Sequence, residues 1–211
     1  MWRKLIHFVF PPVCVVCEKY ADYFCDECQD QIDFLFFEPQ FEQLDVLIDE
    51  IKTLGFFLPP LSTVIKALKY QELQPIGKIL GDLLYKHLTF PKNLDFVTEV
   101  PMHPKRLKWR GYNQAELIAK QLAEKLNTAY APLLIRTKHT KNLAKATTDE
   151  ERHQLIGDSF AINHIYQNQI SGKNILLVDD VITTGSTLGA CATVLRQHQP
   201  NSVSACTAGH E

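Results

Sequence analysis

The stretch NILLVDDVITTGSTL, residues 174–188, decides how this chain is interpreted. Four consecutive apolar residues, 175–178, are typical of a buried strand, and the carboxylates Asp179 and Asp180 follow them directly. A hydroxyl-rich loop comes next, and a helix is predicted from about Ser186. Because ligands of an open α/β sheet bind beyond the carboxyl ends of its strands, this stretch predicts a ligand site. Its members are Asp179, Asp180, Thr183, Thr184, Gly185, Ser186 and Thr187.

The residue types in this stretch indicate a phosphorylated ribose as the ligand. A charged carboxylate only accepts hydrogen bonds, so the neighbouring acids suit the vicinal hydroxyls of a sugar. Gly185 lets the backbone approach a ligand, and the start of the next helix offers free N–H groups to a phosphate. The plainer alternative is that the acids merely end a strand and that Gly185 makes an ordinary turn. The stretch has neither the Gly-Lys pair of a P-loop nor a G-x-G-x-x-G dinucleotide motif.

Strands and helices alternate along the rest of the chain, which predicts an α/β fold with a parallel sheet flanked by helices. Helices are expected from Ser62 as N-cap, from Pro75, over 113–126 with Asn113 as cap, and from Ser186; strands are expected at 96–101, 131–136, 159–163, 174–180 and 202–208. The segment 33–60 suits strand and helix about equally, and we expect a short hairpin or irregular packing there. Residues 1–35 are expected to form a small module, 36–61 a connecting segment packed on the main domain, and 62–211 that main domain.

Length and charge narrow the class of protein. The chain has 211 residues and a net charge of −2, so any affinity for phosphate or nucleic acid must come from local patches. The apolar run near the N-terminus is too short for a signal peptide and ends at Pro11-Pro12, and no stretch is long enough to span a bilayer. We therefore expect a soluble cytoplasmic protein with no membrane span.

The segment 101–115 is such a local patch. It has no acid, and its basic residues alternate with aromatic ones: Lys105, Arg106, Lys108 and Arg110 lie among Trp109 and Tyr112. Three interpretations remain open: a contact to a phosphate-rich ligand, a surface for single-stranded nucleic acid, and a solvated basic turn.

Four of the six cysteines lie within 15 residues. Cys14 and Cys17 form one C-x₂-C pair and Cys25 and Cys28 form another, so each pair can supply two thiolates to a tetrahedral Zn²⁺ ion. Such a closed site is structural rather than catalytic. Disulfides or redox chemistry are the rival interpretations, which a reducing compartment disfavours.

The stretch ILLVDDVITTGSTL resembles the phosphoribosyl-pyrophosphate (PRPP) loop of type I phosphoribosyltransferases. The resemblance implies that the two acids hold the ribose hydroxyls, that the loop 183–187 holds the 5′-phosphate, and that Mg²⁺ accompanies PRPP. It also implies that the segment after the first core strand contacts pyrophosphate. The candidate catalytic residues are then Asp179, Asp180, Arg106 and Arg110, and Lys105 joins the PRPP-binding residues. Purine-salvage members have an acid where this chain has Thr183, so the acceptor of the phosphoribosyl group stays open.

The whole pattern is similar to the ComF family of competence proteins. The four-cysteine module, LKY (68–70), VPMHPKRLKWRGYNQA (100–115), RTKHT (136–140), Arg152 ahead of SFAI and the PRPP loop occur in order. The family often has a glutamine after the threonine of RTKHT, which this chain lacks. The resemblance implies a role in natural transformation and DNA uptake, with single-stranded DNA and other competence proteins as partners.

Two functions follow from this resemblance. One is a transferase that moves phosphoribosyl from PRPP to an unknown acceptor. The other is a non-catalytic competence factor that binds DNA or competence proteins, with PRPP as a regulatory ligand. The family also has a loop that closes over the substrate, for which the segment 138–153 offers Lys145 and Arg152 as candidates.

Overall fold

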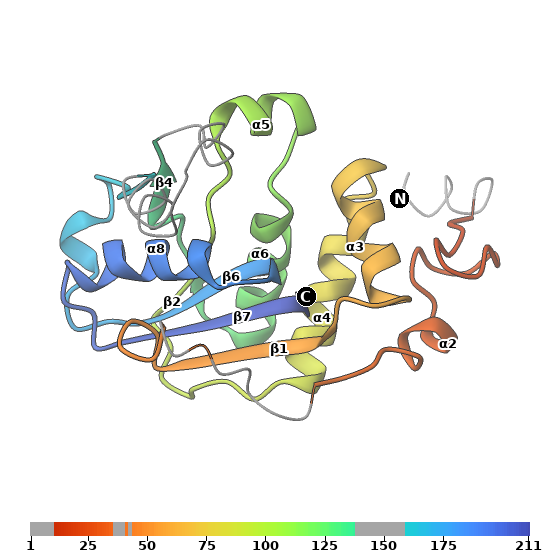
Figure 1. The fold of residues 1–211 in the computed structure, drawn as a ribbon, viewed down its shortest axis with the longest axis horizontal. Coiled ribbons are helices and arrows are strands. Elements are labelled where there is room, and N and C mark those ends of the chain that lie inside the picture. The colour runs from red at the N-terminus through yellow and green to blue at the C-terminus, as the bar shows by residue number, and fades with distance from the viewer. Residues whose placement is uncertain (1–10, 36–40, 42–43, 138–158) are drawn as a thin grey trace.

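The computed structural model describes residues 11–35, 41, 44–137 and 159–211. Within these residues a five-stranded sheet has the order β1-β7-β6-β2-β3, and every neighbouring pair is parallel (Figure 1). The strands are β1 Glu50–Phe56, β2 Phe96–Glu99, β3 Ala129–Tyr130, β6 Asn174–Ile182 and β7 Ser202–His210. The helices are α2 Asp26–Gln29, α3 Leu61–Tyr70, α4 Pro75–His87, α5 Pro104–Arg110, α6 Gln114–Leu126 and α8 Ser186–Arg196, with a 3₁₀ turn η2 Gln167–Gln169. The predicted α/β class is confirmed.

Alternating side chains of the central strand β6 build the two halves of the core. Leu176 and Val178 point into a cluster with α3, α4 and α6, whereas Ile175 and Leu177 point into a second cluster with α8. This alternation is the two-residue period of a strand that is covered on both faces. The same period sends neighbouring side chains at the end of β6 towards different helices, which matters for the site.

Most of the predicted elements form where the sequence places them. Pro75 occupies the first turn of α4, α8 begins at Ser186, and Asn113 caps α6 by accepting a hydrogen bond from the amide of Ala115 at 3.2 Å. Helix α3 begins two residues earlier than predicted, so Ser62 lies inside the helix and Pro60 is the N-cap.

The structure adds to or changes the expected local structure in three places. Residues 50–56 form the strand β1, which pairs parallel with β7 and also makes an isolated antiparallel bridge, Phe34 to Gly55, of the kind expected for a short hairpin. The basic segment contains the short helix α5, which begins at Pro104 and ends at Gly111 with a φ of 84°. The predicted strand 131–136 shortens to β4 Leu134–Arg136, which pairs antiparallel with β5 Phe160–Ile162 outside the main sheet.

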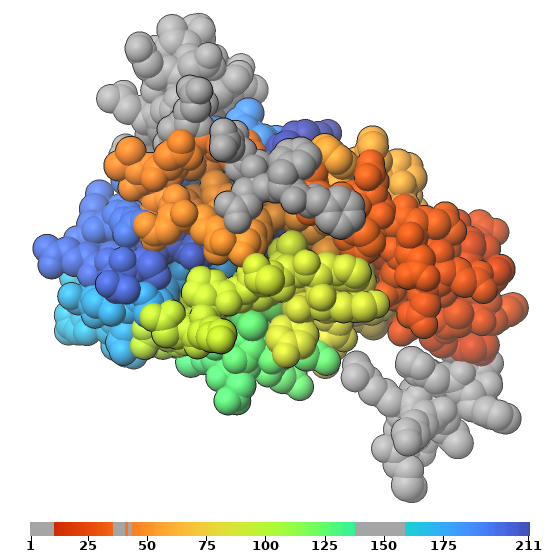
Figure 2. All heavy atoms as spheres, turned by 90° about the horizontal axis from the view of Figure 1, so that it is seen from below, coloured from red at the N-terminus to blue at the C-terminus, as the bar shows by residue number. Residues whose placement is uncertain are grey.

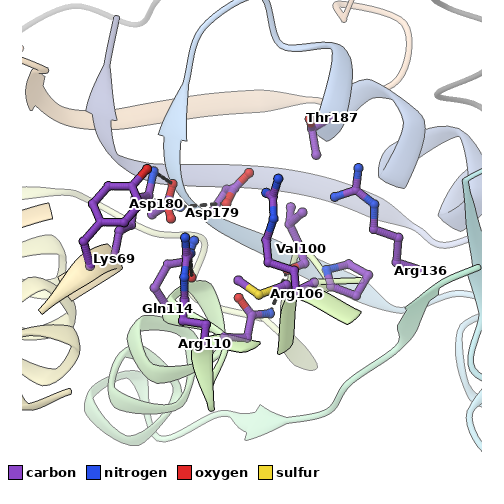
Figure 3. Close-up of a pocket in the computed structure, with 13 residues that line it drawn as sticks. Lys69, Val100, Arg106, Arg110, Gln114, Arg136, Asp179, Asp180 and Thr187 are labelled. Atoms are coloured by element: carbon purple, nitrogen blue, oxygen red, sulfur yellow. Dashed lines mark hydrogen bonds and ion pairs between the residues drawn. The ribbon is translucent and has the colours of Figure 1, made fainter. Parts of the chain in front are cut away.

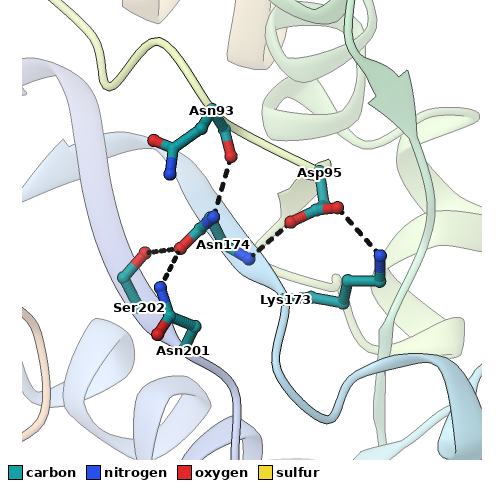
Figure 4. A network of polar contacts seen from close by, with 6 residues as sticks. All are labelled: Asn93, Asp95, Lys173, Asn174, Asn201 and Ser202. Carbon is teal, nitrogen blue, oxygen red and sulfur yellow. Dashed lines mark hydrogen bonds and ion pairs between the residues drawn. The ribbon is translucent and has the colours of Figure 1, made fainter.

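A network of polar contacts connects the amino-terminal ends of the central strands (Figure 4). Asp95 accepts hydrogen bonds from the Lys173 ammonium and from the Asn174 amide, both at 2.9 Å. The side-chain oxygen of Asn174 in turn accepts hydrogen bonds from Asn201 and Ser202 on the way into β7. Because the strands are parallel, fixing their starts also fixes their opposite ends, where the acids lie.

The N-terminal module is packed on the main domain rather than tethered to it (Figure 2). Phe24 and Ile32 belong to the same buried cluster as Val64 of α3 and Leu84 of α4. In Figure 2 the red module lies directly against the orange and yellow segments. Among the described residues, no helix is both long and apolar enough to cross a membrane.

Candidate functional site

A cavity of about 200 Å³ lies at the carboxyl end of β6 (Figure 3). Its charged side chains come from segments that are far apart in the sequence. They are Lys69 at the end of α3, Arg106 and Arg110 of α5, Arg136 of β4, and Asp179 and Asp180 of β6. The fold therefore brings four cations and two carboxylates to one hollow, which suits an anionic ligand that also carries hydroxyl groups.

The two acids have different surroundings, as the strand period requires. Asp180 points towards α3, where its Oδ1 atom lies 2.8 Å from the Lys69 ammonium. Its side chain is only 6% exposed, and Oδ2 has no hydrogen-bond partner in the described part of the chain. Asp179 accepts a hydrogen bond from the backbone amide of Asp180 at 2.8 Å. Burial raises the pKa of Asp179 to about 8, and the charge of Asp180 adds to this rise, while Lys69 and Arg136 oppose it.

Helix α5 delivers two arginines to the cavity. Arg110 donates a hydrogen bond to the side-chain oxygen of Gln114 at 2.8 Å, and its guanidinium lies over the ring of Tyr70 at 5.5 Å from the ring centre. Arg106 lies one turn earlier on the helix and lines the same cavity. His103 caps the helix by accepting a hydrogen bond from the amide of Lys105 at 3.1 Å. The backbone thus holds both guanidinium groups beside the acids.

The loop 183–187 lines a second, smaller hollow of about 40 Å³. Gly185 has a φ of 75° at the N-cap of α8, a conformation that glycine adopts at little cost. The hydroxyls of Thr184 and Ser186 lie 2.8 Å apart. Asp179 and Thr187 line both hollows, so the two spaces share a wall. An eleven-residue helix begins at this loop, and its N-terminus favours an anion.

The structure brings together most of the residues that the sequence singled out. Asp179, Asp180, Arg106, Arg110 and Thr187 line the larger cavity, and Thr183 to Ser186 line the smaller one. Lys105 lines neither; it is exposed in the first turn of α5. The loop candidates Lys145 and Arg152 lie outside the described residues.

Two cations of the cavity were not predicted as site residues. Lys69 reaches Asp180 across 111 positions of sequence, and Arg136 lies over the ring of Phe160 at 5.1 Å from its centre. Burial lowers the pKa of Arg136, as does the charge of Arg106, which lines the same cavity. The short motifs LKY and RTKHT contained both residues, but neither motif by itself assigned them a role.

The four N-terminal cysteines lie together in space. Their sulfur atoms all lie within 4.8 Å of one another, and Cys17 Sγ is 3.6 Å from Cys25 Sγ. Tetrahedral coordination at Zn–S distances of about 2.3 Å needs sulfur atoms about 3.8 Å apart, so the cluster fits this ion. Burial opposes charging of Cys14, but backbone hydrogen bonds from Cys25, Cys17 and Val16 lower its pKa to about 6. Burial instead raises the pKa of Cys25 and Cys28, so the thiols of the cluster differ in how readily they lose a proton.

Comparison with known proteins agrees with this arrangement. The family model described as "Phosphoribosyl transferase domain" matches residues 113–209. Competence protein F of Haemophilus influenzae is 28% identical over 92% of this chain and 89% of its own length. DNA utilization protein YhgH of Escherichia coli K12 is 27% identical over 68% of this chain and 64% of its own, and competence protein ComFC of Bacillus subtilis is 33% identical over 56% and 45%. The last two matches thus span less than two thirds of those relatives.

Solved structures of phosphoribosyltransferases also match. A Bacillus subtilis glutamine PRPP amidotransferase has a TM-score of 0.44 at 21% identity, over 62% of this chain and 25% of that one. A hypoxanthine phosphoribosyltransferase of Staphylococcus aureus has a TM-score of 0.36 at 19% identity, over 65% and 62% of the two chains.

Proposed function

We propose that the chain belongs to the ComF family of phosphoribosyltransferase-like competence proteins, that it binds PRPP with Mg²⁺ and that it serves DNA uptake. In this proposal it transfers the phosphoribosyl group to an acceptor that is not identified. Asp179 and Asp180 hold the ribose diol, the loop 183–187 holds the 5′-phosphate, and the arginines of α5 face the pyrophosphate.

The observation that carries this proposal is the shared wall of the two hollows. Asp179 and Thr187 line both, so one ligand can place a phosphate against the loop and a sugar against the acids. The α5 arginines lie beyond the acids, in the same cavity. A ribose with a phosphate at one end and a second anionic group at the other matches that order of donors and acceptors.

The cations suit the chemistry of phosphoribosyl transfer. The bond between the anomeric carbon and the pyrophosphate oxygen breaks, the leaving group takes the electron pair, and an acceptor nucleophile forms the new bond. Negative charge grows on the pyrophosphate, where Arg106 and Arg110 would stabilise it, while the carboxylates orient the diol. When bound with the ligand, Mg²⁺ would neutralise part of the diphosphate charge.

Calorimetric titration with PRPP in the presence of MgCl₂ tests the binding step. We expect the native protein to bind and the Asp179→Asn/Asp180→Asn double variant to lose binding. Asp82→Asn is the matched control, because Asp82 lies in α4 in an ion pair with Lys125, away from the cavity. Absence of binding by the native protein contradicts the proposal. Release of pyrophosphate on addition of nucleobases or single-stranded DNA then tests turnover.

A second candidate function is binding of single-stranded DNA without catalysis, with PRPP as a regulatory ligand or with competence proteins as further partners. The observation that favours it is that α5 has no buried residue, while Trp109 is 72% exposed between cations. Aromatic side chains interleaved with basic ones stack bases and follow the phosphate backbone. Affinity for single-stranded DNA should fall with rising salt. The Arg106→Ala/Arg110→Ala double variant should make that salt dependence less steep. Trp109→Ala should weaken binding at every salt concentration. The control Lys125→Ala, in α6, should change neither the affinity nor its salt dependence.

The cysteine cluster completes the proposal. Cys14, Cys17, Cys25 and Cys28 would hold one structural Zn²⁺, because four thiolates leave no coordination position open for a substrate. Such a site requires reduced thiols, which assigns the protein to the cytoplasm in this proposal.

A further inference from the structure

The last turn of α3 contacts the site at each of its three residues. The carbonyl of Leu68 accepts a hydrogen bond from the buried hydroxyl of Tyr112, just beyond α5. Lys69 forms the ion pair with Asp180. The ring of Tyr70 lies beneath the guanidinium of Arg110. One helical turn is thus bound both to the acids and to the basic helix.

The rest of α3 is held in place by its packing in the core. Four side chains of this helix are completely buried, each at 0% exposure: Leu61, Val64, Ile65 and Leu68. They belong to the core cluster that also includes residues of the N-terminal module. Lys69 therefore starts from a fixed backbone, and its side chain, 20% exposed, lies in a constrained position. The packing of α3 therefore places the Lys69 ammonium next to Asp180.

Lys69 is the ion-pair partner of the buried Asp180. A buried carboxylate with an unpaired oxygen is unfavourable, and removing its ion-pair partner leaves an uncompensated charge that is relieved by taking up a proton. The other charged groups that line the cavity are Asp179 on the same strand, Arg106 and Arg110 of α5, and Arg136 of β4.

We propose that Lys69 is a positioning residue that keeps Asp180 as an oriented carboxylate, so that the acid pair can accept hydrogen bonds from the vicinal diol of a phosphorylated sugar. This inference rests on the proposed function, since it concerns the same site. It separates the two acids by their surroundings: Asp180 is held by the Lys69 ammonium, whereas Asp179 lines both hollows.

The experiment is a titration of PRPP with MgCl₂ at pH values from 6.5 to 9, for the native protein and the Lys69→Met, Lys69→Arg and Lys66→Met variants. Lys66 lies on the same helix over Phe57 and is the control. We expect Lys69→Met to weaken binding at least about tenfold at pH 7, since buried charged pairs contribute this much or more. The loss should shrink as the pH rises, because hydroxide restores the carboxylate. Lys69→Arg should bind like the native protein at every pH.

A second measurement separates failure of the inference about Lys69 from failure of the proposed function. If the native protein binds and Lys69→Met binds equally well at all pH values, the inference about Lys69 is overturned while the proposed function stands. If the native protein does not bind, the proposed function fails. The ¹³C titration of the Asp180 carboxyl group in ligand-free protein still decides the role of Lys69: in Lys69→Met its midpoint must move to higher pH than in the native protein, and an unchanged midpoint rejects the inference. Thermal unfolding of each variant verifies that it is folded.

Discussion

Leu44 lies directly against Gly185 of the ligand loop. A Cβ atom at Gly185 would lie 2.6 Å from Leu44 Cδ1, and one at Gly189 would lie 2.7 Å from Leu44 Cδ2. The leucine therefore fills the space that these two glycines leave free at the start of α8. A residue that precedes the first strand of the sheet thus supports the loop from outside.

Replacing Gly185 should cost more free energy of unfolding than its positive φ alone explains. Gly185→Ala places a side chain at a φ of 75° and against Leu44, whereas Gly111→Ala places one at a φ of 84° with nothing within 4 Å. The backbone term is about 1–2 kcal/mol for each. In chemical denaturation we expect Gly185→Ala to lose more free energy of unfolding than Gly111→Ala. Leu44→Ala in the Gly185→Ala background should recover part of that difference, and equal losses at the two glycines would contradict the contact.

Arg136 should contribute to PRPP binding. It lines the cavity near Arg106, and two guanidinium groups held near each other favour an anion between them. We expect Arg136→Ala to weaken PRPP binding about tenfold or more, which corresponds to one charged hydrogen bond. Arg136→Lys should restore little, because an ammonium group lacks the planar fork of donors. Arg196→Lys, at the Asp49 ion pair on the far end of α8, should leave PRPP affinity unchanged in the same calorimetric titration.

Glu99 should make the protein less stable as the pH rises. It is 6% exposed at the end of β2, and burial raises its pKa to about 7, with a hydrogen bond to Tyr130 as a smaller opposing effect. Because this pKa lies above the ordinary value of 4.5, the folded state favours the proton. The contribution of protonated Glu99 to the free energy of unfolding is complete below pH 4.5 and is lost as the pH rises through 7. The loss is about 1.4 kcal/mol for each pH unit between the two pKa values.

The Glu99→Gln variant isolates this effect. A neutral amide of similar shape removes the titration, so the variant should gain stability over the native protein between pH 5 and pH 8. Thermal unfolding at several pH values measures the difference. If the two melting temperatures change in parallel over this range, Glu99 does not titrate as its burial requires.

Removal of zinc should unfold more than the cysteine module. Cys14, Cys25 and Cys28 lie in the core cluster that contains α3 and α4, so loss of the metal also loosens those helices. We expect one zinc per chain by metal analysis, and a chelator or Cys28→Ser should remove it and lower the melting temperature. Cys191→Ala, in α8, should keep the metal. Retention of full zinc by Cys28→Ser would contradict the assignment.

Sequence alone predicted the strand–loop–helix order of residues 174–188 well, because its signals are local. Strand residues, acids, a glycine and a helix start follow one another within 15 positions, and the structure keeps that order. The strand period then separates Asp179 from Asp180, a consequence that follows only once both faces of the sheet are known to be covered.

The elements that the sequence missed depend on partners far along the chain. Helix α5 buries no residue, so it has no apolar period to detect, although Pro104, His103 and Gly111 are recognisable end signals. Strand β1 becomes a strand by pairing with β7, about 150 residues later. Lys69 likewise has a role only through Asp180, and no pattern within α3 indicates that partner.

Strand β1 has a consequence for how the chain can be divided. Its seven residues cover the outer side of β7, whose backbone would otherwise present a row of unpaired N–H and C=O groups. A fragment that starts at residue 62 would expose this nine-residue edge, which is almost wholly buried in the full chain, to other molecules. Such an edge templates intermolecular strand pairing, so the transferase-like part without its preceding segment should aggregate rather than fold as an independent unit.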